Sequence, residues 1–290
     1  MNPKLFQVPI DKKISLAKDY DPAMLPEALE KSQASALLQA GVERLAKLQD
    51  VLYAQNTYGI LVIFQAMDAA GKDSTIKHVM SGINPQGCQV FNFKTPTDED
   101  LDHDYLWRYA RCLPERGRIG IFNRSYYEEV LIARVHPHVL ARQQLPHTPE
   151  GNALWTQRFT EINHFEKYLT DNGMIILKFF LNISKAEQKK RFLKRIDTPE
   201  KNWKFAMSDV EERRFWGDYQ QAYEDVFRQT NTIAAPWYVI PANRKWYTRI
   251  VVADIICQRL EALNLHYPTI SQEQQHMLQT ARQMLVSEVD

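Results

Sequence analysis

The sequence predicts an α/β fold in which helices cover both faces of a central parallel sheet. Five apolar runs have the length of strands buried on both faces, and segments of helical length separate them. The first run leads into a loop of small residues that ends in Gly-Lys, the order of a strand, a phosphate-binding loop and a helix. The predicted strands are the run beginning at Tyr58 and residues 89–93, 118–123, 174–182 and 236–241.

Helices are expected between these strands, and they divide the chain into three parts. Residues 1–30 are rich in Pro, Lys and Asp and are predicted to form an extended N-terminal arm. Residues 31–265 form one phosphate-binding domain, and residues 266–290 form a C-terminal helix. The predicted helices of the domain are residues 31–55, 99–112, 125–135, 153–170, 185–196 and 251–265.

Composition narrows the class of protein. A net charge of +1 does not steer the whole molecule to polyanions, so no nucleic-acid partner is expected and any anion site must be local. The three cysteines have no metal-binding or paired spacing, which suits a reducing compartment. Neither a signal peptide nor an apolar run of membrane-spanning length is present. We therefore expect a soluble cytoplasmic protein with no membrane partner.

The strongest candidate site is the loop at the end of the first strand, within residues 58–75. Its glycine and lysine, Gly71 and Lys72, match the end of a P-loop, but Ala66 replaces the first glycine and Asp73 replaces the hydroxyl residue. Alanine is still small, and Gly71 permits close backbone approach to a phosphate. The alternative is an ordinary strand, turn and helix in which Lys72 is solvated.

Asp68 is the unusual residue of this loop. A carboxylate among phosphates repels them unless a divalent cation lies between, so Asp68 is a candidate Mg²⁺ ligand or proton acceptor. Lys72 is the candidate for contact with the phosphoryl group that is transferred. The candidate substrate-binding residues near the first two strands are Ala69, Ala70, Gly71, Asp73, Ser74, Asn84, Lys94 and Thr95.

A second polar element follows the third predicted strand. Asn123 and Arg124 come directly after an apolar run, and the carboxyl ends of parallel strands share one edge of the sheet. Many P-loop enzymes have a metal-binding Asp at this point, and the amide of Asn123 cannot supply that charge. Glu128 or Glu129 is placed to compensate, directly or through water. The alternative makes Arg124 a helix-surface residue paired with Glu128.

A lid is predicted over residues 185–215. Eight Lys and Arg lie between residues 185 and 204, and Arg191 and Arg195 share one face of a helix. A helix, a break at Pro199 and a second helix, with arginines facing a phosphate loop, are typical of a lid that closes on phosphates. The alternative is a solvated charged surface.

The segments MDAAGKDSTIKHVMSGINPQG, GRIGIFNRSYYEEVLIARVHP and NGMIILKFFLNISKAEQKKRFLKRID resemble the polyphosphate kinase 2 family, and the likeness runs from about residue 53 to residue 265. These are polyphosphate-dependent nucleotide phosphotransferases. The resemblance implies a P-loop kinase-like three-layer sandwich with a central parallel sheet and a helical lid. It also implies that Asp68, Lys72, Arg124, Arg191 and Arg195 carry catalysis, with Asp68 at the metal, Arg124 bridging donor and acceptor, and Arg191 and Arg195 clamping phosphates from the lid. Glu128, by its position after Asn123, is the second candidate metal ligand.

The form of the Asn123 segment is similar to the single-domain class that is linked to both AMP and ADP. The resemblance therefore implies Mg²⁺-dependent phosphoryl transfer, with Mn²⁺ as a substitute, between inorganic polyphosphate and AMP, ADP, ATP or guanine nucleotides. It also implies a homodimer or homotetramer. Two other functions are weighed: an ATP-dependent nucleoside or nucleoside-monophosphate kinase, and a nucleotide-binding switch. The switch is disfavoured because this chain lacks the Asn-Lys-x-Asp motif that such proteins usually carry.

Overall fold

A five-stranded parallel sheet forms the centre of the computed structural model, which describes residues 1–10, 12–147, 149 and 151–288. The strands stand in the order β2-β3-β1-β4-β5, and every neighbouring pair is parallel. Their bounds lie close to the predicted ones: β1 Gly59–Gln65, β2 Cys88–Asn92, β3 Ile119–Asn123, β4 Met174–Asn182 and β5 Trp237–Pro241. The predicted α/β architecture is confirmed.

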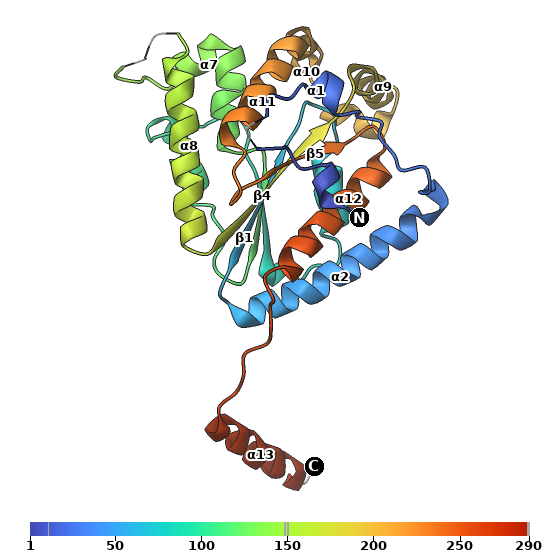
Figure 1. The fold of residues 1–290 in the computed structure, drawn as a ribbon, viewed down its shortest axis with the longest axis vertical. Coiled ribbons are helices and arrows are strands. Elements are labelled where there is room, and N and C mark those ends of the chain that lie inside the picture. Colours follow the sequence, from blue (N-terminus) through green and yellow to red (C-terminus); the bar gives the residue numbers. More distant parts are fainter. Residues whose placement is uncertain (11, 148, 150, 289–290) are drawn as a thin grey trace.

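Helices cover both faces of the sheet, as Figure 1 shows. On one face α2 (Ala34–Gln55) packs along α12 (Lys245–Glu261), which also contacts α3 (Lys72–Val79). On the other face α8 (Ala153–Asp171) packs against α11 (Trp216–Thr230). The strands between these layers are buried along their length in β1, β3 and β5, which is why they read as continuous apolar runs.

The register of the sheet brings two strand ends together. In β1, Phe64 pairs with Asn123 of β3, and Asn92 at the end of β2 pairs with the same Asn123. The loop after β1 and the segment after β3 therefore leave the same edge of the sheet as neighbours. This edge carries the candidate site described below.

Two predicted helices are each broken into short pieces. Residues 99–112 contain α4 (Asp98–Leu101), which is capped by Thr97, and α5 (Trp107–Ala110). Residues 125–135 contain the 3₁₀ helix η4 (Tyr126–Val130) and α6 (Ile132–Val135). In the second case, Leu131 has ψ −86°, so the two pieces cannot continue as one helix.

The N-terminal arm is held against the core rather than free. It contains the short helices η1 (Pro3–Leu5) and α1 (Leu16–Asp19). The backbone N–H of Val8 donates to Trp237 O, and Val239 N–H donates to Phe6 O, so the arm covers the edge of β5. Phe6 is 1% exposed, which shows that the arm contributes to the core.

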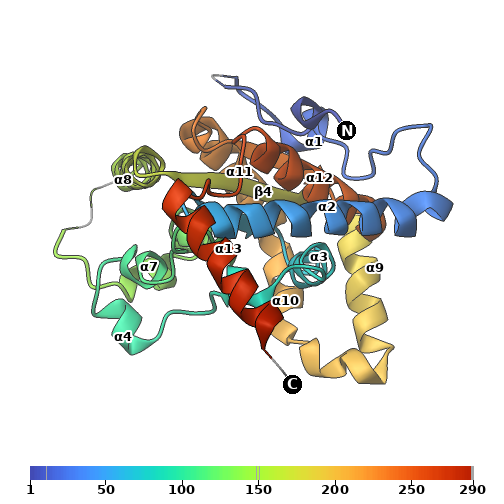
Figure 2. The same ribbon diagram turned by 90° about the horizontal axis from the view of Figure 1, so that it is seen from below.

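The segments predicted as a lid and as a C-terminal helix are both helical, and the lid role stays a prediction. The lid consists of α9 (Lys185–Ile196), η5 (Pro199–Lys204), α10 (Met207–Glu211) and η6 (Glu212–Phe215). Figure 1 shows α13 (Gln272–Ser287) below the body of the protein, joined to it by an extended segment, and in Figure 2 this helix lies in front of the body. The remaining short helices are η2 (Lys31–Gln33), η3 (Pro85–Gly87) and α7 (Pro137–Ala141). Within the described ranges, no helix is both long and apolar enough to cross a membrane.

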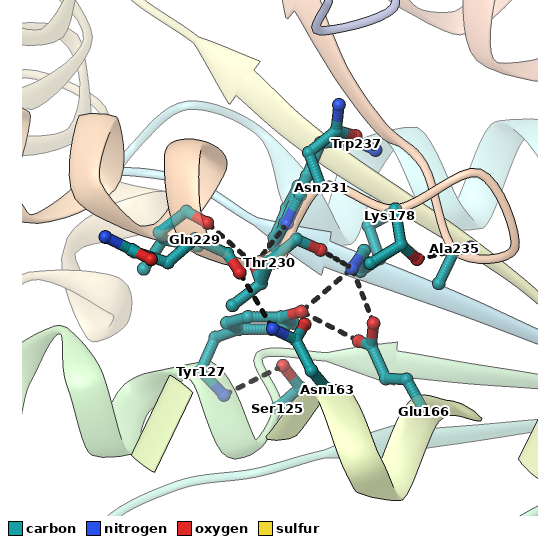
Figure 3. A network of polar contacts seen from close by, with 12 residues as sticks. Ser125, Tyr127, Asn163, Glu166, Lys178, Gln229, Thr230, Asn231, Ala235 and Trp237 are labelled. Atoms are coloured by element: carbon teal, nitrogen blue, oxygen red, sulfur yellow. Dashed lines mark hydrogen bonds and ion pairs between the residues drawn. The ribbon is translucent and has the colours of Figure 1, made fainter. Parts of the chain in front are cut away.

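A buried ionic network joins the layers beneath the site (Figure 3). The ammonium group of Lys178, on β4, donates to Glu166 Oε2 at 2.6 Å, to Tyr127 Oη at 2.9 Å and to Thr230 O at 2.8 Å. Tyr127 Oη in turn donates to Glu166 Oε1 at 2.7 Å. Because Tyr127 lies in η4, this network ties β4, α8 and α11 to the segment that follows Asn123.

Candidate active site

The loop between β1 and α3 contains two residues with left-handed backbone conformations. Ala69 has φ +58° and Gly71 has φ +107°, and such left-handed residues let successive N–H groups point to one side. Within the described part of the chain, the N–H groups of Ala69 and Gly71 donate to no protein acceptor. Gly71 is also the N-cap of α3, whose positive helix end favours anions. The loop has the form of an anion site.

Lys72 is buried, so the alternative of a solvated lysine is wrong. Its side chain folds back on the loop, where Nζ donates to Ala66 O at 3.0 Å. Burial lowers the pKa of Lys72, and the nearby Arg124 lowers it further, whereas the carboxylate of Asp68 raises it. A bound phosphate could replace the carbonyl acceptor of this cation.

Asp68 and Arg124 face each other across the site. Arg124 Nη2 lies 3.3 Å from Asp68 Oδ1. Arg124 has φ +66°, a strained conformation for a residue with a side chain, and it turns the guanidinium toward the loop instead of along η4. Glu128 and then Asp68 raise the pKa of Arg124 despite its burial. The arginine pairs with the loop, and the predicted alternative of a helix-surface pair with Glu128 is not what the structure shows.

Asn123 and Asp73 form the second link between the two strand ends. Asn123 Nδ2 donates to Asp73 Oδ1 at 2.7 Å. Among the described residues, the buried Asn123 Oδ1 has no hydrogen-bond partner. Ser74 Oγ donates to Gly71 O at 3.1 Å, so this hydroxyl stabilises the loop in the present structure. The residues expected near the phosphates, 69–71, 73, 74 and 123, are thus brought together.

Arg191 does not have the free guanidinium that a phosphate clamp requires. Its side chain is 9% exposed, and burial lowers its pKa. Its five N–H groups are shared among Glu187 Oε1 and the carbonyl oxygens of Ala69, Ala70, Ala242 and Asn243, at 2.6 to 3.2 Å. In this structure, which contains no phosphate, Arg191 therefore holds the loop, and the phosphate contact expected of it stays a prediction.

Arg195 lies further along the lid helix and is more accessible. Its Nη1 donates to Asp209 Oδ2 at 3.1 Å and to Lys204 O at 3.0 Å, so it pairs within the lid. Burial, and then the charge of Asp68, raise the pKa of Asp209. Arg195 remains a candidate phosphate contact, because only one of its two terminal amino groups is engaged by these bonds.

A pocket of about 260 Å³ lies between the loop and the lid. Asp68, Arg124 and Glu128 line it from the core, as expected. The pocket is also lined by seven residues that the sequence did not predict as site residues: Gln188, Ser208, Asp209, Glu212, Arg213, Tyr219 and Tyr223. No motif or spacing in the sequence singles out the two tyrosines.

The donor atoms of the pocket suit a hard divalent cation. Asp68 and Glu128 contribute carboxylates, and the unpartnered Asn123 Oδ1 adds a third oxygen nearby on β3. In the described part of the chain, no three His, Cys, Asp or Glu side chains converge as a preformed metal cage. Mg²⁺ commonly uses one or two carboxylates together with phosphate oxygens and water, so a site completed by substrate fits these residues.

Three other expectations are corrected or narrowed. Glu129 cannot assist the metal, because its buried carboxylate lies 3.5 Å from Arg158 Nη1 and accepts from Gln143 at 2.5 Å. Asn84 precedes β2 and caps η3, which places it at the opposite edge of the sheet from the loop. Lys94 and Thr95 follow β2, so they leave the sheet at the edge of the site and are exposed.

Comparison with known proteins gives one consistent result. The family model described as Polyphosphate kinase 2 matches residues 28–268. The chain is 50% identical over 284 residues to an ADP-polyphosphate phosphotransferase of Rhodopseudomonas palustris, covering 97% of this chain and 98% of the relative. It is 46% identical over 267 residues to an AMP/ADP-polyphosphate phosphotransferase of Meiothermus ruber, covering 91% and 95%. The crystal structure of polyphosphate kinase 2 from Arthrobacter aurescens TC1 superposes with a TM-score of 0.87 at 40% identity, covering 97% of both chains.

Proposed function

Because this chain belongs to the polyphosphate kinase 2 family, we propose that it transfers phosphoryl groups between inorganic polyphosphate and the nucleotides AMP and ADP. One observation carries the proposal beyond family membership. A carboxylate and an arginine, Asp68 and Arg124, face each other at 3.3 Å in a pocket between an anion-binding loop and a lid. Such a site can hold two phosphate groups of opposite roles, one on the loop and one beside Arg124.

In the proposed reaction, Lys72 and the N–H groups of the loop hold the phosphate chain. An oxygen of the acceptor phosphate attacks the phosphorus that is transferred, and the bond to the leaving phosphate oxygen breaks. Arg124 lies between the loop and the lid, with 39% of its side chain exposed, and neutralises charge on both groups. Asp68 orients Arg124 and would help to hold the metal.

The family and its chemistry call for a divalent metal, and we propose Mg²⁺, with Mn²⁺ as a substitute, held by Asp68 and Glu128. When bound, the metal neutralises charge on the phosphate oxygens. The proposed substrates are polyphosphate with AMP, ADP or ATP, and guanine nucleotides are included in the proposal. We expect the protein to act in the cytoplasm without nucleic-acid or membrane partners.

A direct assay tests this proposal. Purified protein with Mg²⁺ is given polyphosphate and, in separate reactions, AMP, ADP, GMP or GDP, and the products are separated by chromatography. A parallel reaction supplies ATP and unphosphorylated nucleosides. We expect ADP and ATP to form from polyphosphate and no nucleoside to be phosphorylated. Turnover only with ATP and a nucleoside would instead establish the alternative, an ATP-dependent nucleoside kinase.

We also propose that the protein is a homodimer or homotetramer assembled with the help of α13. This helix has no buried residue in the single chain, and isolated helices of about this length are marginal in water. Met277, Leu278, Met284 and Leu285, spaced by seven residues, are all more than half exposed along one stripe. Contact with a second copy would cover that stripe and stabilise the helix.

Analytical ultracentrifugation of substituted protein tests the assembly. Leu278→Gln combined with Leu285→Gln should shift the protein toward the monomer. Gln279→Ala combined with Gln283→Ala, on the opposite side of α13, is the matched control and should leave the mass unchanged. An unchanged mass in the first variant would remove α13 from the interface.

A further inference from the structure

Two side chains of the lid helix α9 donate hydrogen bonds to the backbone carbonyl groups of the phosphate loop. Gln188 Nε2 donates to Asp68 O at 2.9 Å. Arg191 Nη1 donates to Ala69 O at 3.0 Å and to Ala70 O at 2.7 Å. Three successive carbonyl groups of the loop are therefore bonded to donors on one helix.

These bonds determine which side of the loop faces a ligand. When the carbonyl oxygens of consecutive residues are fixed toward α9, the peptide N–H groups between them must point away from it. The left-handed conformation of Ala69, with φ +58°, is unfavourable for alanine by itself. Donors that bind the carbonyl groups stabilise this conformation before any phosphate arrives.

Gln188 also connects the loop to the return segment of the lid. Its Oε1 accepts from Arg213 Nη1 at 2.5 Å, and Arg213 donates to Lys185 O as well. Gln188 is 2% exposed, so its amide is shielded from water and both of its bonds are strengthened by the low local polarity. Gln188 thus links Arg213 to the carbonyl group of Asp68.

We propose that Gln188 and Arg191 are positioning residues that preorganise the phosphate loop, and that Arg191 acts through the loop rather than by contact with substrate. The proposal rests on the proposed function in one respect, namely that the loop binds phosphate. It differs from a clamp because a clamp needs free N–H groups, and those of Arg191 are all bonded to protein acceptors in this structure.

The experiment measures phosphate binding separately from catalysis. Inorganic tripolyphosphate with Mg²⁺ is titrated into the full-length protein by calorimetry at several salt concentrations. The variants are Gln188→Met, which keeps size and neutrality, and Arg191→Lys, which keeps the charge but cannot bond several carbonyls at once. Lys190→Met, on the exposed side of α9, is the control, and a melting temperature is recorded for each protein.

Positioning predicts that Gln188→Met and Arg191→Lys each weaken binding by about 10- to 100-fold, the range for losing hydrogen bonds that involve buried polar or charged groups. The slope of log K against log salt should stay at the wild-type value, because neither variant changes the charge. The double variant should lose less than the product of the two single losses, because both act on the same loop. Lys190→Met should keep nearly full affinity at high salt.

If Gln188→Met binds tripolyphosphate as tightly as the wild type and Arg191→Lys binds it more weakly, the proposal is overturned. Arg191 would then be assigned a direct contact with phosphate. Wild-type binding by both variants would mean that the loop holds its own shape, which also overturns it. If Arg191→Lys does not fold, Gln188→Met still decides the outcome. A wild-type protein that binds tripolyphosphate but transfers no phosphoryl group would end the proposed function and leave this inference intact.

Discussion

The side-chain amide of Asn123 donates a hydrogen bond to Asp73 Oδ1 at 2.7 Å, joining the end of β3 to the first turn of α3. In many phosphate-loop enzymes these two places hold an Asp on the strand and a hydroxyl residue on the helix. Here the carboxylate stands on the helix and a neutral group on the strand. The pair therefore still carries one negative charge, and this charge, on Asp73, lies in the first turn of α3, where the helix dipole stabilises it.

Asn123→Asp should make the protein dependent on divalent metal for stability. The change places a second carboxylate at hydrogen-bond distance from Asp73, and two such groups repel unless a cation or proton lies between. We expect the melting temperature without metal to fall by roughly 2–4 °C for each kcal/mol of repulsion, and Mg²⁺ to restore most of it. Thermal melting with EDTA and with Mg²⁺ checks this. A variant as stable as wild type in EDTA would show that the pair tolerates both charges.

Asp68→Asn should reduce turnover by about 10²–10³-fold, a typical loss for one charge-stabilising contact, while the fold is kept. The substitution removes the carboxylate that faces Arg124 and that is proposed beside the metal. Steady-state assays at saturating Mg²⁺, with melting temperatures recorded in parallel, give the measurement. Retention of more than about half of the wild-type rate would refute the metal role, because no contact of that size could then have been lost.

Phosphate binding should weaken at high pH earlier than an ordinary lysine would allow. Burial lowers the pKa of Lys72 from 10.5, so the ammonium form that binds phosphate is lost as pH rises through this lowered value. In the absence of ligand, the folded state binds fewer protons than the unfolded chain between the two pKa values, so stability rises with pH across that window.

Titration of tripolyphosphate affinity from neutral pH upward measures this effect. Lys72→Arg serves as the comparison, since a guanidinium stays charged over the same range. Its affinity should be lower throughout and flat where that of the wild type falls. Parallel curves for the two proteins would assign the pH dependence to another group.

Arg195 should contribute to binding of the polyphosphate chain. Arg195→Ala should lower affinity and make it less sensitive to salt, because a lost phosphate contact releases fewer counterions, by analogy with nucleic-acid backbones. Arg195→Lys should lower turnover, because lysine lacks the bidentate fork. Lys185→Ala, at the start of the same helix and exposed, is the charge-matched control and should do much less. Equal effects of the two alanine variants would show that the lid cations act only by general electrostatic attraction and that Arg195 has no specific role.

The ion pair beneath the site should be needed for stability. Lys178→Met leaves Glu166, which is 2% exposed, buried without a cation, and breaking such a pair typically costs about 3–5 kcal/mol. Lys178→Met combined with Glu166→Leu should recover part of that loss, because neither charge then remains buried. Urea unfolding of the three proteins gives the free energies. A double variant less stable than Lys178→Met would contradict the argument.

Several features were determined by the sequence alone. Continuous apolar runs predicted the parallel strands, most clearly β1, β3 and β5, because a strand covered on both faces has no polar side. Gly71 and Lys72 directly after such a run predicted the phosphate loop, since the chemistry of backbone anion binding requires this order. Helix α9 was predicted with its observed bounds, Lys185–Ile196, and the family resemblance was likewise carried by local segments.

Other features were decided only by the tertiary structure. Whether Arg191 faces a phosphate or the loop depends on carbonyl groups from residues 69–70 and 242–243, which the fold brings to one guanidinium from distant parts of the chain. Helical spacing placed Arg191 and Arg195 on one face but could not say what that face meets. Likewise, Glu129 is withdrawn from the site by Arg158, far along the sequence. Local pattern sets which groups are available, and long-range packing sets which partner satisfies each of them.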